Sequence, residues 1–506
     1  MLQKFILKLS PMAVALLFVL SGSASGREVS ALIPAGDPIY RELQLADLLG
    51  LLSEPLRGEQ PISRERAFHL MMPFGEGLGV DTGLLPIEAD PSSGLTRPVA
   101  KRLERARSWI NPYDVFWGRG EYPCTFAFNP RKIVRFEGSQ IKRGLDAPHY
   151  LDYGENRSEG LALVRDGEFF VEAEGFALRG DWRMRFDRHA LTYRPLSLHV
   201  STQFRNFRAT LGRLPLAWGP ERHGGLVIST NARPLDQLLL QSDRPFTLFG
   251  AESLGDFTAK MFLGKLDDPY RNDAVSPWLV GARFTYAPRK WLVLGASRTS
   301  MLGGEGNDFI ITPGSVIDLI LAKNENRVGG DQTNNTDHKA TVDWSLYLYP
   351  LLRSLPLLDG GRLYGQYGGE DSPQEGPLPS ATGHTYGIEL VAKGVLLRAE
   401  ASNVRDDRNL WYWHNIYTDG YTYRGRVMGH PMGQDSRAEG YLVSAPLGEW
   451  GLVTASMERQ EHGFYAELNT PPSGSTSPIP YGVQDTFTLR VEKFMDGQLG
   501  TLGIEG

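Results

Sequence analysis

From about residue 130 to the end, apolar and polar residues alternate, and this pattern constrains the fold more than any other feature. In one such segment Val280, Ala282 and Phe284 alternate with Gly281 and Arg283. A period of two is typical of β-strands with one apolar face. Comparable segments are residues 197–204, 257–263, 292–296, 341–348 and 487–492.

Alternation alone fits a soluble barrel or sandwich as well as a membrane barrel. The polar face, however, carries full charges near mid-strand, which a dry core would exclude. These residues are Arg283, Asp343, Glu389, Arg398 and Glu400. Beyond the N-terminus no apolar run is long enough for a transmembrane helix, and a closed barrel is the other structure that satisfies its backbone in lipid. We therefore predict a mostly β fold, a large antiparallel transmembrane β-barrel of roughly 16 to 18 strands over residues 126–506.

Two local features refine this prediction. Asp166–Gly167 and Asp359–Gly361 are combinations typical of turns, and we expect them between strands. The last strand is expected to end near Phe494 and to leave a short tail up to Gly506.

The N-terminus has the pattern of a secretory signal peptide. Lys4 and Lys8 precede the apolar run Met12–Leu20, and the small residues of Ser21–Gly26 follow it. An uncleaved membrane anchor is the alternative, but this run is short for a hydrocarbon layer of about 30 Å. We predict a signal peptide at residues 1–26, its cleavage, and a location in the bacterial outer membrane.

Between the signal peptide and the barrel the pattern is helical. Asp37 can cap a helix that has Pro38 in its first turn. Further helical segments are expected at residues 64–72 and from Pro98 to Ile110. We predict a small helical subdomain at residues 27–125, which acts as an amphipathic cap and packs on the larger structure.

Composition and motifs exclude several classes of function. The net charge is -6 and no long basic block is present, which disfavours a nucleic-acid partner. The single cysteine, Cys124, excludes an intramolecular disulfide and a cysteine-based zinc site. Motifs of serine hydrolases, zinc proteases and P-loop enzymes are absent from the sequence. We expect no catalytic residues, metal site or cofactor, and a protein that is not an enzyme.

The densest group of functional side chains lies between residues 405 and 437. Aromatic rings suit the faces of sugars, and arginine binds carboxylates such as those of uronic acids. The candidate polysaccharide-binding residues here are Trp411, Trp413, His414, Tyr417, Tyr421, Tyr423, Arg424 and Arg426. The alternative is structural, with girdle aromatics and charge pairs inside the barrel.

A second candidate group lies between residues 218 and 233. It comprises Trp218, Arg222, His223 and Arg233, with glycines that permit a tight turn or a close backbone approach. This group could bind polysaccharide, brace the barrel, or seat the helical subdomain.

Six blocks of the chain, in a fixed order, carry a family resemblance. They are Pro34–Asp37 with Leu43–Asp47; Leu216–Pro220 with His223–Leu226 and Ser229–Pro234; Pro277–Phe284; Leu294–Thr299; Tyr364–Gln366 with Gly369–Asp371; and Ile416–Arg426 with Gly429–His430 and Asp435–Ser436. Together they resemble the capsule-assembly Wzi family of outer-membrane proteins. The resemblance implies an 18-stranded outer-membrane barrel, a periplasmic helical subdomain and a lectin-like role.

These observations lead to one main hypothesis for function. The protein would bind capsular or extracellular polysaccharide and anchor or organise it at the cell surface. The alternative is a channel component for exopolysaccharide export, and a third hypothesis is an enzyme that trims glycans. The expected partners are the polysaccharide, outer-membrane lipid and, for the export hypothesis, the polysaccharide export machinery.

Overall fold

The computed structural model describes most of the chain, apart from the N-terminus and several loops. The described residues are 29–73, 97–110, 124–139, 147–148, 151–157, 160–188, 190–250, 254–269, 276–305, 336–352, 357–370, 381–405, 411–414, 417–449, 451–463, 482–495 and 498–505, with residues 271, 307, 309, 312 and 355. The predicted signal peptide, residues 1–26, lies outside the described residues. No helix in the described part of the chain is both long enough and apolar enough to cross a bilayer.

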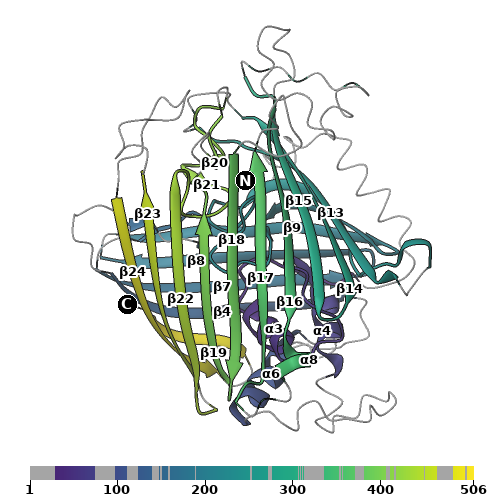
Figure 1. Cartoon of the computed structure of the whole chain (residues 1–506), viewed down its shortest axis with the longest axis vertical. Coiled ribbons are helices and arrows are strands. Elements are labelled where there is room, and N and C mark those ends of the chain that lie inside the picture. The colour runs from purple at the N-terminus through teal and green to yellow at the C-terminus, as the bar shows by residue number, and fades with distance from the viewer. Residues whose placement is uncertain are drawn as a thin grey trace.

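Seventeen strands form a closed barrel (Figure 1). They are β4 (Cys124–Ser139), β7 (Gly160–Ala173), β8 (Phe176–Asp187), β9 (Leu191–Phe204), β10 (Phe207–Leu214), β12 (Leu235–Ser242), β13 (Asp256–Lys265), β14 (Trp278–Arg289), β15 (Leu292–Leu302), β16 (Thr336–Tyr347), β17 (Gly360–Glu370), β18 (Ala381–Ala392), β19 (Val395–Asn403), β22 (Ser436–Leu447), β23 (Gly451–His462), β24 (Gly482–Met495) and β25 (Gln498–Glu505). The fold class predicted from alternation is thus confirmed, with 17 barrel strands in the described residues against roughly 16 to 18 expected.

The odd number of strands decides how the barrel closes. Strands that alternate in direction leave the first and last of an odd set pointing the same way. Accordingly β25 pairs with β4 in parallel, with Thr501 opposite Ile133, whereas every other neighbouring pair of the barrel is antiparallel.

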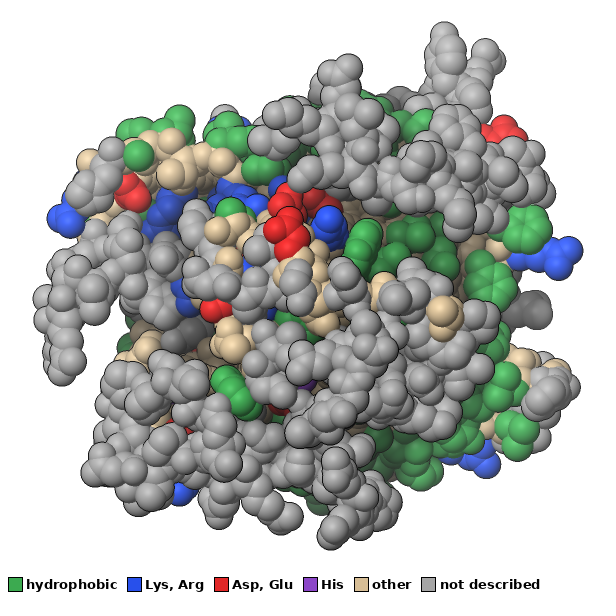
Figure 2. All heavy atoms as spheres, turned by 90° about the horizontal axis from the view of Figure 1, so that it is seen from above, with side chains coloured by type: hydrophobic (Ala, Val, Ile, Leu, Met, Phe, Trp, Pro, Cys, Tyr) green, Lys and Arg blue, Asp and Glu red, His purple; other side chains and the backbone are tan. Residues whose placement is uncertain are grey.

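The two faces of the wall differ in the way that the alternation predicts. On β14, Phe284 is exposed on the outside, while the neighbouring Arg283 is buried inside and pairs with Asp343 of β16 at 2.7 Å. Figure 2 shows hydrophobic side chains along the outer margin of the molecule and a group of charged side chains nearer its middle. An apolar outside and a polar inside are typical of a barrel that spans a membrane.

The two ends of the barrel have different connections. At one end, here called the short-turn end, residues 174–175, 290–291, 393–394 and 448–450 join neighbouring strands. At the other, the long-loop end, the connections include residues 140–159, 215–234, 303–335 and 404–435. This asymmetry is typical of outer-membrane barrels, whose short turns face the periplasm.

The remaining elements are short. They are β1 (Leu32–Ile33), α3 (Ile39–Leu48), β2 (Glu59–Gln60), β3 (Ile62–Ser63), α4 (Arg64–Leu70), α6 (Arg97–Ile110), β5 (Ala147–Pro148), β6 (Asn156–Arg157), β11 (Ala217–Trp218), η1 (Leu248–Gly250), α8 (Tyr349–Leu352), β20 (Thr422–Tyr423) and β21 (Arg426–Val427).

The three predicted N-terminal helices are present. The N-cap residue of α3 is Pro38 rather than the predicted Asp37, which lies one residue earlier and accepts a hydrogen bond from the amide of Ile39 at 3.0 Å. Ser63 caps α4 by accepting from the amide of Arg66 at 3.2 Å. The apolar faces of α3, α4 and α6 form one core that also includes Val391 of β18.

The N-terminal segment, residues 29–73, packs inside the short-turn end of the barrel (Figure 1). Arg64 pairs with Glu172 of β7 at 3.0 Å. Asp37 pairs with Arg179 of β8 at 3.3 Å, and the Tyr347 hydroxyl donates to Asp47 at 2.5 Å. These contacts join residues 29–73 to the inner wall of the barrel. The predicted subdomain at residues 27–125, with its boundary near residue 125, stays a prediction.

This segment meets the loop 215–234 inside the barrel. Strand β2 pairs with β11, which places Glu59 opposite Trp218, and Gly219 donates to the Gly58 carbonyl at 2.9 Å. The backbones approach so closely that a Cβ at Gly58 would lie 2.6 Å from the Gly219 oxygen. The chain therefore bridges the interior between the two ends.

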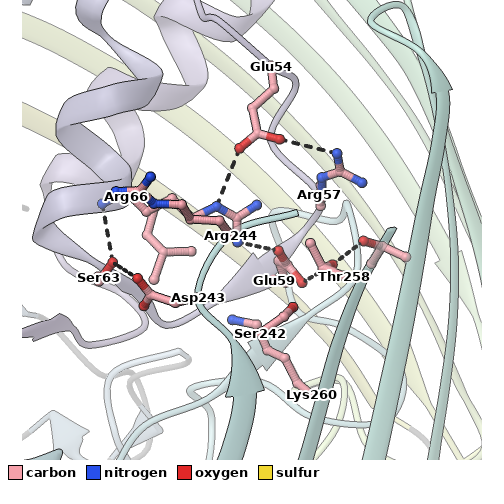
Figure 3. Close-up of polar contacts among 12 residues, drawn as sticks. Glu54, Arg57, Glu59, Ser63, Arg66, Ser242, Asp243, Arg244, Thr258 and Lys260 are labelled. Carbon is pink, nitrogen blue, oxygen red and sulfur yellow. Dashed lines mark hydrogen bonds and ion pairs between the residues drawn. The ribbon is translucent and has the colours of Figure 1, made fainter. Parts of the chain in front are cut away.

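Glu59 is the charged centre of this junction (Figure 3). Its carboxylate accepts from Arg66 at 2.8 Å and from the Thr258 hydroxyl of β13 at 2.8 Å. Burial alone would raise the pKa of Glu59, but Lys260, Arg66 and Arg57 outweigh burial and lower this pKa to about 2.

Two local predictions were wrong. Asp166–Gly167 lies within β7 rather than in a turn, because the glycine makes room for the Trp182 ring; a Cβ at Gly167 would lie 2.3 Å from it. The expected C-terminal tail contains strand β25, which has β24 on one side and β4 on the other. Its glycines, Gly500 and Gly503, interrupt the alternation that marks the other strands.

We predict that Glu59→Gln loosens the junction between residues 57–63 and 215–221. Removing one partner of a buried ion pair costs about 3 kcal/mol, which corresponds to roughly a hundredfold faster amide exchange at this junction. Hydrogen exchange with mass spectrometry measures this effect. The matched control is Glu65→Gln, because Glu65 pairs with the half-exposed Arg244 and should contribute about 1 kcal/mol or less. Equal changes in both variants would contradict the prediction.

Acidification should loosen the same junction. The pKa of Glu59 is about 2 in the folded protein, below its unfolded value of about 4.3. Its stabilising contribution is therefore complete above about pH 5 and is lost as the pH falls toward 2. The difference in unfolding free energy between the wild type and Glu59→Gln, measured in urea, should shrink over this range, and a constant difference would contradict the assignment.

Candidate functional site

The aromatic residues predicted to bind sugar form a buried core inside the long-loop end. Trp411, Tyr417 and Tyr421 are fully buried, and Tyr423 and His414 are nearly so. The core combines them with apolar residues of the loop 215–234, among them Trp218, Leu226 and Ile228. In this structure the buried rings have no face open to a ligand.

Hydrogen bonds fix this core to the loop and to the wall. The Tyr421 hydroxyl donates to the Val227 carbonyl at 2.8 Å and lies 2.9 Å from the Thr299 hydroxyl of β15. The Tyr412 hydroxyl donates to the Leu226 carbonyl at 2.7 Å. The aromatic segment thus holds the loop 215–234 in place, which matches the structural alternative considered for these residues.

Arg222 and His223 lie deep in the interior. Arg222 pairs with Glu389 at 3.2 Å, and His223 pairs with Glu458 at 3.3 Å. Glu389 also pairs with Arg362 at 2.8 Å and Arg398 at 2.9 Å, so three guanidinium groups surround one carboxylate. Trp218, in turn, packs edge-on against Phe262 with ring centroids 5.4 Å apart. All three predicted residues therefore brace the filled interior.

The arginines at the long-loop end are more accessible. Arg233 lies two residues before β12 and is partly buried. Its pKa is lowered first by burial and then by the positive charges of Arg194, Arg424 and Arg213. We call these four residues the arginine cluster. Within the described residues no carboxylate lies within ion-pair distance of Arg233.

The other members of the cluster have partners that orient them. Arg213 makes a two-pronged contact with Asp236 at 2.8 and 2.9 Å. Arg194 lies 3.8 Å from Glu155, whose carbonyl accepts from Arg426 at 3.3 Å.

Arg424 lies over the Tyr423 ring and donates to the Asp267 carbonyl at 3.0 Å. A planar guanidinium next to an aromatic ring can contact both the carboxylate and the apolar face of an acidic sugar.

The structure therefore divides the predicted site residues into two groups. Arg233, Arg424, Arg426 and Trp413 are partly buried and belong to segments at the long-loop end, whereas the others, including the partly buried Arg222 and His223, pair or pack within the filled interior. Sequence reasoning missed Arg194 and Arg213, which stand on strands β9 and β10. An arginine near a strand end has no local signal. Arg213 comes close to Arg233 because β10 pairs with β12, and Arg424 joins them from a connection that is distant in sequence.

One acidic group has the spacing of a metal site. Asp37, Glu168 and Asp181 bring their oxygen atoms together inside the barrel. The Arg179 guanidinium, however, pairs with all three, at 3.3, 2.5 and 3.1 Å. A cationic side chain therefore already balances these carboxylates.

Comparisons with known proteins agree with this architecture. The chain matches the family model "Capsule assembly protein Wzi" over residues 165–505. An uncharacterized 55.8 kDa protein in the cps region of Klebsiella pneumoniae is 27% identical over 242 residues. That alignment covers 46% of this chain and 44% of the relative, which is less than half of its length.

Among solved structures, Wzi of Escherichia coli aligns with a TM-score of 0.64 at 18% identity, over 93% of each chain. That protein is described as an outer membrane, carbohydrate-binding β-barrel involved in group 1 capsule assembly. OprD of Pseudomonas aeruginosa aligns at a TM-score of 0.38, too low to support an argument. The family model covers more than half of the chain, which therefore belongs to the Wzi family of capsule assembly proteins.

Proposed function

We propose that this protein is an outer-membrane barrel that binds acidic capsular or extracellular polysaccharide at its long-loop end and holds it at the cell surface. The observation that carries the proposal is the arginine cluster, in which Arg233 has like-charged neighbours and no carboxylate partner among the described residues. A group of this kind attracts anions, and a uronic acid carboxylate fits the two-pronged geometry of a guanidinium. The carbohydrate-binding description of the Escherichia coli relative supports the same class of ligand.

The orientation follows from the connections between strands. Short turns face the periplasm in outer-membrane barrels, and long loops face the outside. The arginine cluster would then face the medium, and the N-terminal helices would face the periplasm. Export by a cleaved signal peptide, and contact with outer-membrane lipid, belong to this proposal.

The filled interior favours holding the polymer over conducting it. The β2–β11 pair joins segments from both ends, and the aromatic core of residues 411–423 packs above it. For the export alternative, this interior would have to rearrange before a polymer could pass. We therefore propose a binding protein without catalytic activity, which can act beside an export machinery without serving as its pore.

Removing the arginine cluster's charge should weaken binding. In the double variant Arg233→Gln/Arg424→Gln, the loss of charge-assisted hydrogen bonds of about 1.5–3 kcal/mol should raise the Kd for an acidic polymer at least about tenfold. The measurement is calorimetric titration of the detergent-folded protein with the producing cell's own polysaccharide. The matched control is Arg244→Gln, which removes an exposed arginine at the short-turn end. A double variant that binds like the control would contradict the proposed site.

A chemically modified ligand isolates the electrostatic contribution. Reduction of the polymer's carboxyl groups to alcohols should weaken binding to the wild type and leave the double variant unaffected. Equal losses in both proteins would assign the carboxylate contact to other residues.

Two tryptophans of one segment should respond differently to truncation. Trp411→Ala removes a fully buried ring and should destabilise the folded protein by about 3–5 kcal/mol. Trp413→Ala removes a partly buried ring and should leave the Tm close to that of the wild type while weakening polysaccharide binding. Thermal unfolding in detergent, followed by titration of the folded variants, separates the two effects. Normal stability of Trp411→Ala would contradict the structural role assigned to the aromatic core.

A further inference from the structure

The connection between β16 and β17 exposes large apolar side chains at the short-turn end of the barrel. Leu351 is 71% exposed, Leu357 62% and Leu355 49%. The neighbouring β14–β15 turn adds Trp291, which is 42% exposed. We call these four residues the leucine patch. Exposed apolar groups of this size are unusual on a surface that meets only water.

The fold holds the patch outward. The Tyr347 hydroxyl donates to Asp47 at 2.5 Å and lies 3.0 Å from the Leu56 carbonyl, which ties the start of the connection to the interior. The Tyr349 ring lies against Gly50, where a Cβ would come within 2.7 Å of it. Helix α8 begins at Tyr349, and two residues later Leu351 is exposed. Figure 1 shows α8 at the short-turn end of the barrel.

The patch is continuous with the apolar outer wall. Leu292 pairs with Leu346, and the Tyr347 amide donates to the Trp291 carbonyl at 2.8 Å, so the turn and the connection are neighbours. Above them on the same strands, Leu294 and Trp344 are exposed on the outside of the barrel. The surface that faces lipid therefore extends to the end of the wall and onto the connection.

The rim of the patch carries positive charge. Arg289 and Lys290 are exposed at the β14–β15 turn, directly before Trp291. A tryptophan and basic residues beside aliphatic side chains are typical of segments that lie in the interface of a bilayer. This arrangement complements the anionic phosphates of phospholipids.

We propose that the leucine patch is an interfacial anchor that inserts into the phospholipid leaflet at the short-turn end of the barrel. The anchor would fix the height and tilt of the barrel at the side where the N-terminal helices lie. This inference rests on the membrane location proposed above, but not on polysaccharide binding.

The experiment places a fluorescent probe at three single cysteines in a Cys124→Ser background. Leu351→Cys reports on the patch, Val342→Cys on the exposed outer wall, and Ser108→Cys on the exposed face of α6 at the same end. The full-length protein is labelled with an environment-sensitive dye and inserted into vesicles of phosphatidylethanolamine and phosphatidylglycerol. Heat-dependent migration in gels confirms that each variant forms the barrel.

We expect the Leu351 probe to be quenched by lipids with a shallow nitroxide and protected from aqueous iodide, as for a group about 5–10 Å below the surface. The Val342 probe should also be quenched by nitroxide lipids, and the Ser108 probe by iodide only. The anchor would be overturned if iodide quenched the Leu351 probe as strongly as the Ser108 probe while the Val342 probe stayed in lipid. That result would leave the proposed function intact. If Val342 were also accessible to iodide, the membrane location itself would fail.

Discussion

Seventeen strands enclose more space than their own inward side chains can fill, and much of this molecule follows from that constraint. Barrels of about eight strands are filled by side chains, whereas barrels of about 16–18 strands leave a channel. Here residues 29–73 enter from one end, and the loop 215–234 with the described part of residues 404–435 enters from the other. These segments pair their charged groups with charges of the wall and pack their apolar groups against each other and against apolar wall residues such as Phe262.

The interior is accordingly organised in charge groups and apolar cores. Arg179 balances carboxylates from β7, β8 and the N-terminal segment, and Glu389 balances three arginines. Charges at this depth are costly unless they are paired, so the pairs specify where each inserted segment sits. The aromatic core then excludes water between the segments, which explains why rings of a kind common in sugar-binding sites are buried here.

This use of the aromatic residues changes how the function is understood. In the structure, the rings of residues 411–423 mainly support the loop 215–234, and that loop carries Arg233 to the long-loop end. The candidate site is therefore a small group of arginines on a rigid base. Its rigidity limits the entropy lost on binding a polymer, which favours a holding role.

Much of the architecture could be predicted from the sequence because strand alternation and helix caps are local. A charge in the middle of a strand, as at Arg283, indicates a polar face, and a serine just before a helix, as at Ser63, is typical of a cap. Neither interpretation needs information about distant residues. Features that depend on a distant partner could not be predicted in this way. Gly167 lies in a strand because the Trp182 ring covers it, and β25 forms because β4 offers a second edge.

The sequence by itself determined a chain with a helical start, a β-barrel and an aromatic, arginine-rich segment in its C-terminal third. Tertiary structure decided that the barrel is filled, that most of the aromatic rings are buried, and that Arg194 and Arg213 join Arg233 and Arg424. The physical reason is that long connections fold back into the barrel, which brings together residues far apart in the chain and determines whether a side chain faces water or a packed interior.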